Sequence, residues 1–355
     1  MIRSNSRNGQ DAGWRGDLFG SPLRGAASVL LIALIGWAAW RVGLWALAHA
    51  VFRPDAAACR AAQGACWGVI AEKWRPILFG RYPYAEQWRA ALALALFVAM
   101  LLASAWPRLW RRALALAWAV ALALFALLMR GGLFGLPAVP ASNWGGLPLT
   151  LSLAAVSLAL AFPLAALLAL ARRSRWPALR SLAATYIEIV RGVPLISVLF
   201  MASFLLPLLW PAHWRPDALL RVLAGLTLFV AAYFAEIIRG GLQAVPRGQL
   251  EAARALGLTG WQVQHHVALP QALRMALPAL MNSVIGTLKD TSLVTVVGLF
   301  ELTGALSLAL GGDPLWRPFY LEGYLFIALL YWLMCFGLSR YGAWIERRLT
   351  AGDAG

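Results

Sequence analysis

The residues whose types could do chemistry lie inside apolar segments of this sequence. Lys289 and Asp290 are adjacent, near the middle of an apolar stretch at 277–299. Two hydroxyl side chains, Thr291 and Ser292, follow them directly. A charge at the centre of a membrane-spanning helix costs about 2.5–3.5 kcal/mol on insertion scales, so each charge needs a partner or a watery cavity. These residues are therefore candidates for a pathway or gate, and an internal ion pair that holds helices together is the alternative.

Further polar residues lie in neighbouring parts of the apolar stretches. Glu236 and Arg239 are three residues apart, so they can pair on one face of a helix. Glu236 lies deeper in its stretch and is the better candidate to face a substrate, although a salt bridge at the membrane surface would use the same pair. Asn282 could hydrogen-bond between helices or line a path. A zwitterionic substrate at the middle of the membrane needs both signs of charge or helix ends.

No cluster typical of catalysis or metal binding is apparent. The four histidines have no metal-ligand spacing, and His265 and His266 are expected to be ordinary polar residues. Neither Lys73 nor Lys289 ends a G-x-x-x-x-G-K-[ST] loop, which would cradle the phosphates of ATP. We therefore expect no metal site, no cofactor and no ATP hydrolysis in this chain.

A polar segment begins at Glu251, ends at Pro270 and reads EAARALGLTGWQVQHHVALP. It predicts two short helices. Glu251 suits a first helical turn, where a carboxylate faces the positive end of the helix dipole, and Gly257 can end that helix in a left-handed conformation. Thr259 and Gln262 can form a capping box for the second helix, which Pro270 is expected to end. On local features alone, the segment could equally be an amphipathic loop on the membrane surface.

The composition indicates a membrane protein with several spanning helices. Hydrophobic residues make up 61% of the 355 residues, and the mean hydropathy is +0.69. Charged residues make up 13%, about half the usual share in a soluble domain. Eighteen Trp and 32 Gly fit membrane helices with aromatic residues at the interfaces. The net charge of +16 is first a topology signal, because nucleic-acid binding would need a soluble basic face and none is apparent.

The apolar stretches predict an all-α polytopic membrane protein with about eight transmembrane helices. In chain order they are 26–50, 90–106, 112–129, 147–171, a stretch that ends near 211, 219–238, 277–299 and 323–338. The first could instead be a cleaved signal peptide, although its length fits a spanning helix. A tail, 1–25, precedes an N-terminal extension, 26–130, that contains three spans.

Charge predicts the orientation of the chain. Basic residues are more frequent on the inner side if the N-terminus is cytoplasmic, as the positive-inside rule requires. Both termini and the segment from Glu251 to Pro270 then face the cytoplasm, and a long loop, 51–89, lies outside. Cys59 and Cys66 fall in that loop, where a disulfide is permitted. Two unpaired thiols are the alternative.

The second half of the chain resembles a known family. E-A-A, three residues, Gly257, nine residues and V-x-L-P resembles the "EAA" signature of permease subunits of ATP-binding-cassette (ABC) importers. Val267 stands where isoleucine is usual in that signature. Other stretches are similar to permeases for polar amino acids: LTLS at 149–152, YIEIVRGVPL at 186–195, YFAEIIRGGLQAVPRGQ at 233–249 and KDTSLV at 289–294. The extra N-terminal spans and the long loop resemble the long-form subunit of general L-amino acid importers.

This resemblance implies a fold, a function and partners. The stretch 147–349 would be a five-helix core of the type I ABC importer permeases, with a cytoplasmic loop, 240–276, that couples it to ATP hydrolysis. The coupling residues would be Glu251, Ala252, Ala253, Gly257, Leu269 and Pro270. A second, similar permease subunit would pair with the chain in the bacterial inner membrane. Two copies of a separate ATPase would bind ATP and Mg²⁺, and a periplasmic binding protein would deliver amino acids, over a broad range of L-amino acids.

Two other classes of protein are compatible with parts of the sequence. A secondary carrier or channel could use Lys289, Asp290 and Glu236 as ion or proton sites, but it predicts internal inverted repeats, and no repeat is clear. It also leaves the EAA segment without a purpose. A membrane scaffold leaves the charges in the apolar stretches unexplained. The sequence therefore favours a permease subunit of an ATP-driven importer.

Overall fold

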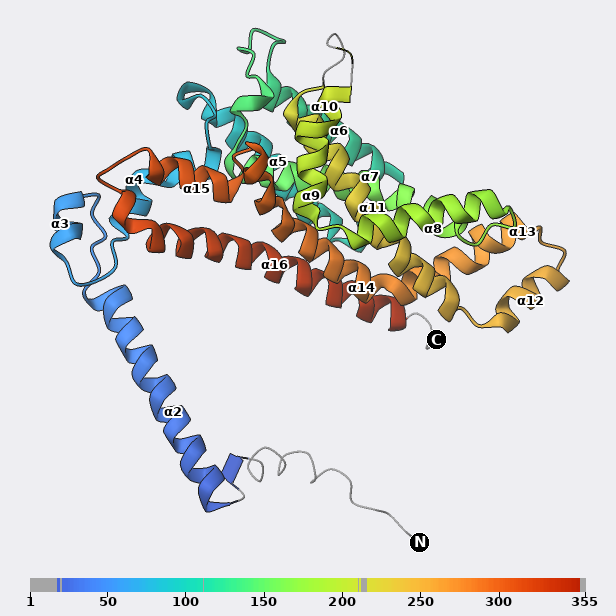
Figure 1. The fold of residues 1–355 in the computed structure, drawn as a ribbon, viewed down its shortest axis with the longest axis horizontal. Coiled ribbons are helices and arrows are strands. Elements are labelled where there is room, and N and C mark those ends of the chain that lie inside the picture. The colour runs from blue at the N-terminus through green and yellow to red at the C-terminus, as the bar shows by residue number, and fades with distance from the viewer. Residues whose placement is uncertain (1–17, 20, 111, 210, 212–215, 352–355) are drawn as a thin grey trace. The chain divides into compact units, whose positions relative to one another are not determined.

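The described residues of the computed structural model, 18–19, 21–110, 112–209, 211 and 216–351, are mostly helical (Figure 1). They divide into two compact units, Met1–Glu72 and Lys73–Gly355. The tail expected at 1–25 falls largely on residues outside the described ones. The three spans of the predicted extension are shared between the units, because the second and third lie in the second unit.

The first unit contains a long apolar helix and a disulfide-linked segment. Its helices are α2 (Pro22–Gly43), continued by a π-helical turn (Leu44–Ala48), α3 (Ala56–Ala61) and the start of α4 (Gly68–Phe79). The side chain of Ser21 accepts a hydrogen bond from the backbone N–H of Arg24 and caps α2. No residue of α2 is buried, as expected for an apolar helix that lipid surrounds. A disulfide joins Cys59 to Cys66, with 5.3 Å between the Cα atoms.

The second unit is a bundle of long helices with shorter helices between them. In chain order they are α5 (Gln87–Ser104), α6 (Arg112–Arg130), α7 (Gly146–Ala171), α8 (Pro177–Gly192), α9 (Leu195–Phe200), α10 (Leu206–Leu209), α11 (Ala218–Ala244), α12 (Arg247–Ala255), α13 (Gly260–Gln262), α14 (Leu269–Asp290), α15 (Leu302–Gly311) and α16 (Tyr320–Ala351). A π-helical segment, Val263–Ala268, joins α13 to α14, and a 3₁₀ helix, Thr291–Val297, follows α14.

Six helices within the described residues are long and apolar enough to cross a membrane. A seventh crossing is added if α8 and the segment Leu195–Leu209 count as one span, bent by 106°. The bend lies at Val193, which is extended, because the residue before Pro194 is disfavoured in the helical conformation. The sequence predicted about eight. The difference lies in α14, which begins at Leu269 and not at 277, and so includes polar residues at both ends.

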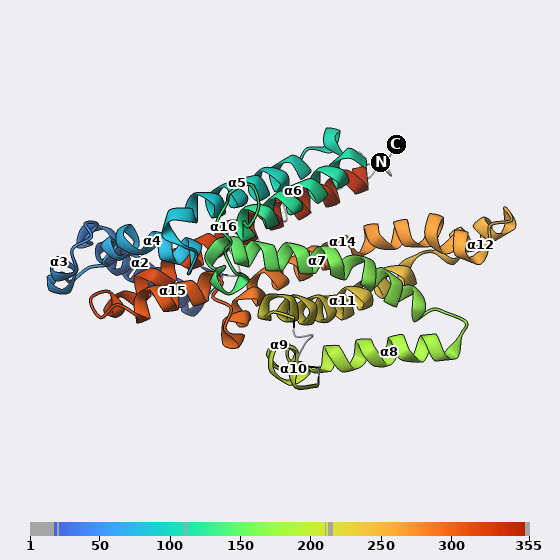
Figure 2. The ribbon, with the colours of Figure 1, turned by 90° about the horizontal axis from the view of Figure 1, so that it is seen from above.

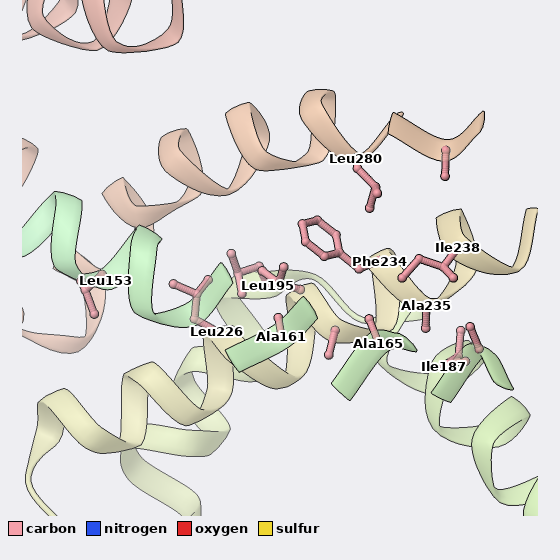
Figure 3. Packing of buried hydrophobic residues seen from close by; sticks show 14 of the residues in the cluster. Leu153, Ala161, Ala165, Ile187, Leu195, Leu226, Phe234, Ala235, Ile238 and Leu280 are labelled. Carbon is pink, nitrogen blue, oxygen red and sulfur yellow. The ribbon is translucent and has the colours of Figure 1, made fainter. Parts of the chain in front are cut away.

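The core of the second unit is built on α11, which packs against both α7 and α14 (Figure 2). Small residues on α7 and α11, among them Ala161, Ala165 and Ala235, are fully buried between larger ones (Figure 3). Small side chains let membrane helices approach closely, and that packing drives their association in lipid. Helices α11 and α14 approach closely at Gly241 of α11, where an added Cβ would clash with the carbonyl oxygen of Ala272 on α14.

The hairpin of α5 and α6 lies beside this core, with α16 (Figure 2). Phe97 of α5 packs edge-on against Trp118 of α6, with ring centroids 5.6 Å apart. The fully buried Arg89 donates to the carbonyl oxygens of Leu128 and Pro137, both at 2.9 Å. Its guanidinium therefore fixes the end of α6 to the loop that leads toward α7.

The contact of α11 with α14 can be tested at two adjacent glycines. Gly241→Ala should lower the thermal unfolding midpoint of the purified chain, because overpacking costs about 1–3 kcal/mol. Gly240→Ala is the matched control, since no atom lies within 4 Å of the added Cβ and alanine favours a helix by about 0.5–1 kcal/mol. We expect an unchanged or raised midpoint for Gly240→Ala. Equal midpoints for the two variants would contradict the close packing.

Candidate functional site

The segment between α11 and α14 forms a bent pair of helices at one end of the bundle (Figure 1). It contains the residues predicted to couple the chain to an ATPase, and the end where it lies is therefore named the coupling-loop end. Gly257 has a left-handed conformation, with φ at 82°, and ends α12 as predicted. Thr259 and Gln262 form the predicted capping box: the N–H of Gln262 donates to the Thr259 hydroxyl, and the N–H of Thr259 donates to the Gln262 side chain at 2.8 Å. The predicted helix-break-helix pattern is confirmed.

Two details of the predicted loop are wrong. Glu251 is not in a first turn, because α12 begins four residues earlier, at Arg247, directly after Pro246. Pro270 does not end the second helix, since the chain continues without a break through the π-helical segment into α14, where the proline lies in the first turn. A proline is tolerated there because the first N–H groups of a helix need no intrahelical partner.

The loop presents most of α12 to its surroundings. Ala253 is the buried residue of that helix, whereas Glu251 and Ala252 are exposed. Leu256, the residue before the bend, is 83% exposed. Exposure of a large apolar side chain to water is unfavourable. This surface is therefore suited to binding a partner protein that would cover Leu256.

A groove connects the second helix of the loop to the turn between α7 and α8. Trp261 and Gln264 line one side of this groove, and Trp176 and Leu179 line the other. Trp261 is 63% exposed, and its ring stacks on that of His265. His265 and His266 are both exposed, and no metal-binding group of His, Cys, Asp and Glu was found among the described residues.

A cluster of charges lies where α7, α8 and α11 meet at the same end. Glu236 accepts hydrogen bonds from Arg239, as the spacing predicted, and from Arg172 at 3.1 Å. Arg172 also pairs with Glu188 of α8 at 2.7 Å. Arg191 approaches Glu236 within 3.8 Å. The carboxylate of Glu236 is therefore held by guanidinium groups from three segments, and the sequence had indicated only the one on its own helix.

The other predicted polar residues lie farther along α14. Lys289 is exposed and Asp290 half-buried, in the last turn of the helix and not at the middle of a span. Neither forms an ion pair within the described part of the chain. Asn282 is exposed, whereas the buried Thr291 donates to the carbonyl of Leu288 at 2.7 Å. Together with the half-buried Ser292, these residues lie near the point where α14 becomes a 3₁₀ helix.

Glu301 is a site residue that the sequence reading missed. Its side chain is fully buried. Its carboxylate caps α15 by accepting from the N–H groups of Thr303 and Gly304, at 2.8 and 3.1 Å. The hydroxyl of Tyr331, on α16, donates to the same carboxylate at 2.8 Å. We call this the Glu301 network.

Two threonines complete the Glu301 network. Thr295, on the 3₁₀ helix, donates to the carboxylate at 3.1 Å. Thr150, on α7, lies 3.2 Å from it and accepts from the N–H of Leu302 at 3.0 Å. The network therefore joins α7, the 3₁₀ helix, α15 and α16 at the end of the bundle opposite the coupling loop. Its only sequence signal was an acidic residue one position before an apolar helix.

An ion pair between Lys73 and Asp313 also lies at that opposite end. Lys73, at the middle of α4, donates to Asp313 at 2.7 Å and joins that helix to the turn between α15 and α16. This hydrogen bond lowers the pKa of Asp313 below its ordinary value. Because both side chains are partly exposed, the pair contributes little to stability.

Comparison with known proteins identifies the family. Residues 161–351 match the family model described as "Binding-protein-dependent transport system inner membrane component". This chain belongs to that family. It is 44% identical to the inner membrane amino-acid ABC transporter permease protein YhdY of Escherichia coli, over 81% of this chain and 79% of the relative. It is 36% identical to the glutamate/glutamine/aspartate/asparagine transport system permease protein BztC of Rhodobacter capsulatus, over 94% and 92%.

A solved structure is also similar. The crystal structure of an amino acid ABC transporter with histidines has a chain that is 33% identical, with a TM-score of 0.51, and the match covers 57% of this chain and 92% of that one. The all-helical fold with a permease core in its C-terminal part is therefore confirmed. As a member of the family, the chain is the transmembrane component of an inner-membrane transporter, carries no cofactor and is not itself the ATPase. The family implies an ATPase and a binding protein as partners.

The Glu301 network predicts a graded loss of stability. Glu301→Ala leaves the buried N–H of Gly304 and several partly buried donors without an acceptor, and an unsatisfied buried donor costs about 1–3 kcal/mol. Glu301→Gln is the matched control: its amide oxygen can accept from Thr303 and Gly304, and its NH₂ group can donate to the hydroxyl of Tyr331. Thermal unfolding of the purified chain should give a much lower midpoint for alanine than for glutamine. Equal midpoints would show that the carboxylate is not the centre of the network.

Proposed function

We propose that this chain is the permease subunit of an ATP-driven importer of polar L-amino acids, and that residues 251–270 are its coupling element. The observation that carries the proposal is the exposed helix pair at the coupling-loop end, in a chain that belongs to a family of transmembrane transport components. Two long relatives, YhdY and BztC, are named as permease proteins of amino acid transport systems. The name of BztC, which matches most of the chain, includes acidic and amide amino acids and supports a polar, broad range.

The exposed residues of the coupling loop fit a helix that docks into a groove of the ATPase. Ala252 lets this helix approach a partner closely, and Leu256 offers an apolar contact. Glu251 can accept hydrogen bonds from a basic residue of the partner. Ala253 is buried instead. A movement of α12 would therefore be transmitted through this residue to the rest of the chain. Leu269 and Pro270 begin α14, which would carry that movement along the membrane.

The residues proposed to line the substrate pathway lie in two groups, one at the coupling-loop end and one nearer the opposite end of the bundle. At the coupling-loop end, Glu236 and Arg239 belong to the charge cluster that joins three helices, and a change of partner for Arg172 would open or close that end. Nearer the opposite end, Lys289 and Asp290 supply both signs of charge without an ion pair of their own among the described residues. Free charges of both signs suit a zwitterionic amino acid. Asn282, Thr291 and Ser292 would contribute polar groups beside them.

The orientation and the assembly are part of the same proposal. With both termini and the coupling loop in the cytoplasm, the basic residues obey the positive-inside rule. A second, similar permease subunit would cover exposed apolar residues of α8 and of the segment after it, such as Leu182, Ile189 and Phe204. Two copies of the ATPase would bind below, and a periplasmic binding protein would deliver the amino acid to the opposite end.

The coupling element predicts an uncoupled transporter. Gly257→Asp should abolish uptake while ATP hydrolysis by the assembled complex continues, because aspartate is strained at a φ of 82°. Gly260→Asp is the matched control in the same loop, since Gly260 has ordinary helical geometry and open space around an added Cβ. Glu251→Lys should uncouple in the same way. Amino acid uptake and ATP hydrolysis are both measured in proteoliposomes. Uptake at the wild-type rate by Gly257→Asp would contradict the assignment of residues 251–270 as the coupling element.

The function itself is tested by uptake of labelled amino acids. Proteoliposomes that contain the chain with its partner permease, ATPase and binding protein should accumulate labelled glutamate with ATP, and unlabelled glutamine, aspartate and asparagine should compete. Uptake by the chain alone under an ion gradient would instead show a secondary carrier.

In the same assay, Lys289→Met or Asp290→Asn should raise the KM for the amino acid several-fold. An unchanged KM in both variants would remove these residues from the pathway.

A further inference from the structure

Two segments far apart in sequence meet at the coupling-loop end of the second unit. The turn between α5 and α6 lies against the last turns of α16, and Ser104 is the point of contact. Its carbonyl oxygen accepts from the indole N–H of Trp110 at 2.8 Å and from the hydroxyl of Tyr341 at 2.9 Å. Its hydroxyl accepts from the indole N–H of Trp118 at 2.8 Å. The polar ends of three aromatic side chains are therefore fixed on one residue.

Aromatic rings form a connected layer around this contact. Trp110 packs edge-on against Trp344 of α16, with centroids 6.1 Å apart. Trp344 also stacks on Tyr341, at 5.9 Å. Trp110 is 43% exposed and Trp106 is 63% exposed. Large rings with an apolar body and a polar end are typical of the level of the lipid headgroups, so this layer marks where the spans leave the hydrocarbon.

Positive charge gathers on the same two segments. Arg108 lies on the turn, and Arg340 and Arg348 lie on α16, all exposed. The guanidinium of Arg348 lies over the ring of Trp344, 5.1 Å from its centroid. Neither Arg108 nor Arg340 forms an ion pair within the described part of the chain. In sequence, the turn 104–112 contains no acidic residue, and 340–349 contains only Glu346.

The surface beside these cations is apolar and exposed. Leu102 lies on α5, two residues before Ser104, and is 65% exposed. Leu333 and Phe336 lie on α16 before Arg340, and each is at least 50% exposed. A lipid combines an anionic headgroup with apolar chains, and this arrangement matches both parts of it. An acidic protein segment would match the cations but not the apolar surface that continues from them.

We propose that the turn between α5 and α6 and the end of α16 form a binding site for the headgroup of an anionic phospholipid. The site contains Arg108, Arg340 and Arg348 as charge partners, and Trp110 and Trp344 as the layer above the acyl chains. Because its two segments come from the N-terminal extension and from the family core, a bound lipid holds the extension hairpin against the core. Lipid binding at this site uses residues of this chain alone and is independent of the transported substrate.

The site is tested by lipid binding to the purified, delipidated full chain. Phosphatidylglycerol and phosphatidylcholine are added in turn, while native mass spectrometry counts bound lipids and the thermal unfolding midpoint is followed. Phosphatidylglycerol should bind and raise the midpoint, and phosphatidylcholine should not. Arg340→Gln/Arg348→Gln should weaken phosphatidylglycerol binding by about tenfold or more, since each basic residue near an anionic surface adds to the attraction. Arg340→Lys/Arg348→Lys should restore most of it.

The control removes the same charge elsewhere at this end. Arg175→Gln/Arg180→Gln changes two exposed arginines, one just before α8 and one in its first turn, and should leave phosphatidylglycerol binding unchanged. Arg108→Gln/Arg340→Gln keeps the contact of Arg348 with Trp344, and it should show the loss even if the first variant folds poorly. Equal losses in the test and control pairs, or no loss in either test pair, would overturn the site. So would inorganic phosphate that raises the midpoint as much as phosphatidylglycerol, because the ligand would then be a soluble anion.

Discussion

The close approach of α11 to α7 and α14 is the constraint on which the rest of the structure depends. In lipid, apolar residues gain little from leaving their surroundings, so helices associate through tight packing of small side chains. Gly241 against Ala272, and buried alanines such as Ala165 and Ala235, provide that packing. Because α11 and α14 flank the coupling loop directly, the packed contact between them connects both ends of the loop to the core of the bundle. A force on α12 can then reach the far end of the bundle.

Polar networks close the two ends of the bundle. At the coupling-loop end, the Glu236 cluster consists of exchangeable ion pairs that are partly exposed. At the opposite end, the Glu301 carboxylate is fully buried and accepts from hydroxyl and backbone donors. Partly exposed ion pairs can exchange partners at small cost, whereas a buried carboxylate that loses its donors cannot. The ion pairs around Glu236 can therefore rearrange at a smaller cost than the hydrogen bonds of Glu301.

Local sequence signals predicted the local structure well. Gly257 and the Thr259–Gln262 capping box depend on residues within one turn, and the Glu236–Arg239 pair depends on helical spacing. The failures involve distant partners. Arg172 lies 64 residues from Glu236, and Thr150 lies 151 residues from Glu301, so neither contact has a spacing to read. The prediction that Pro270 ends a helix is wrong because a proline can stand at the beginning or at the end of a helix. The π-helical segment before it has no sequence pattern that would have decided between the two.

The central claim is that the loop from Glu251 to Pro270 is where the ATPase acts on this chain. The most direct test is photo-cross-linking within the assembled transporter. A benzophenone is attached to the cysteine of a Leu256→Cys variant that also carries Cys335→Ser. Leu315, 53% exposed between α15 and α16, gives the matched control at the opposite end. Illumination should cross-link position 256, and not position 315, to the ATPase. The absence of an ATPase adduct at position 256, or equal adducts at both positions, would contradict the account.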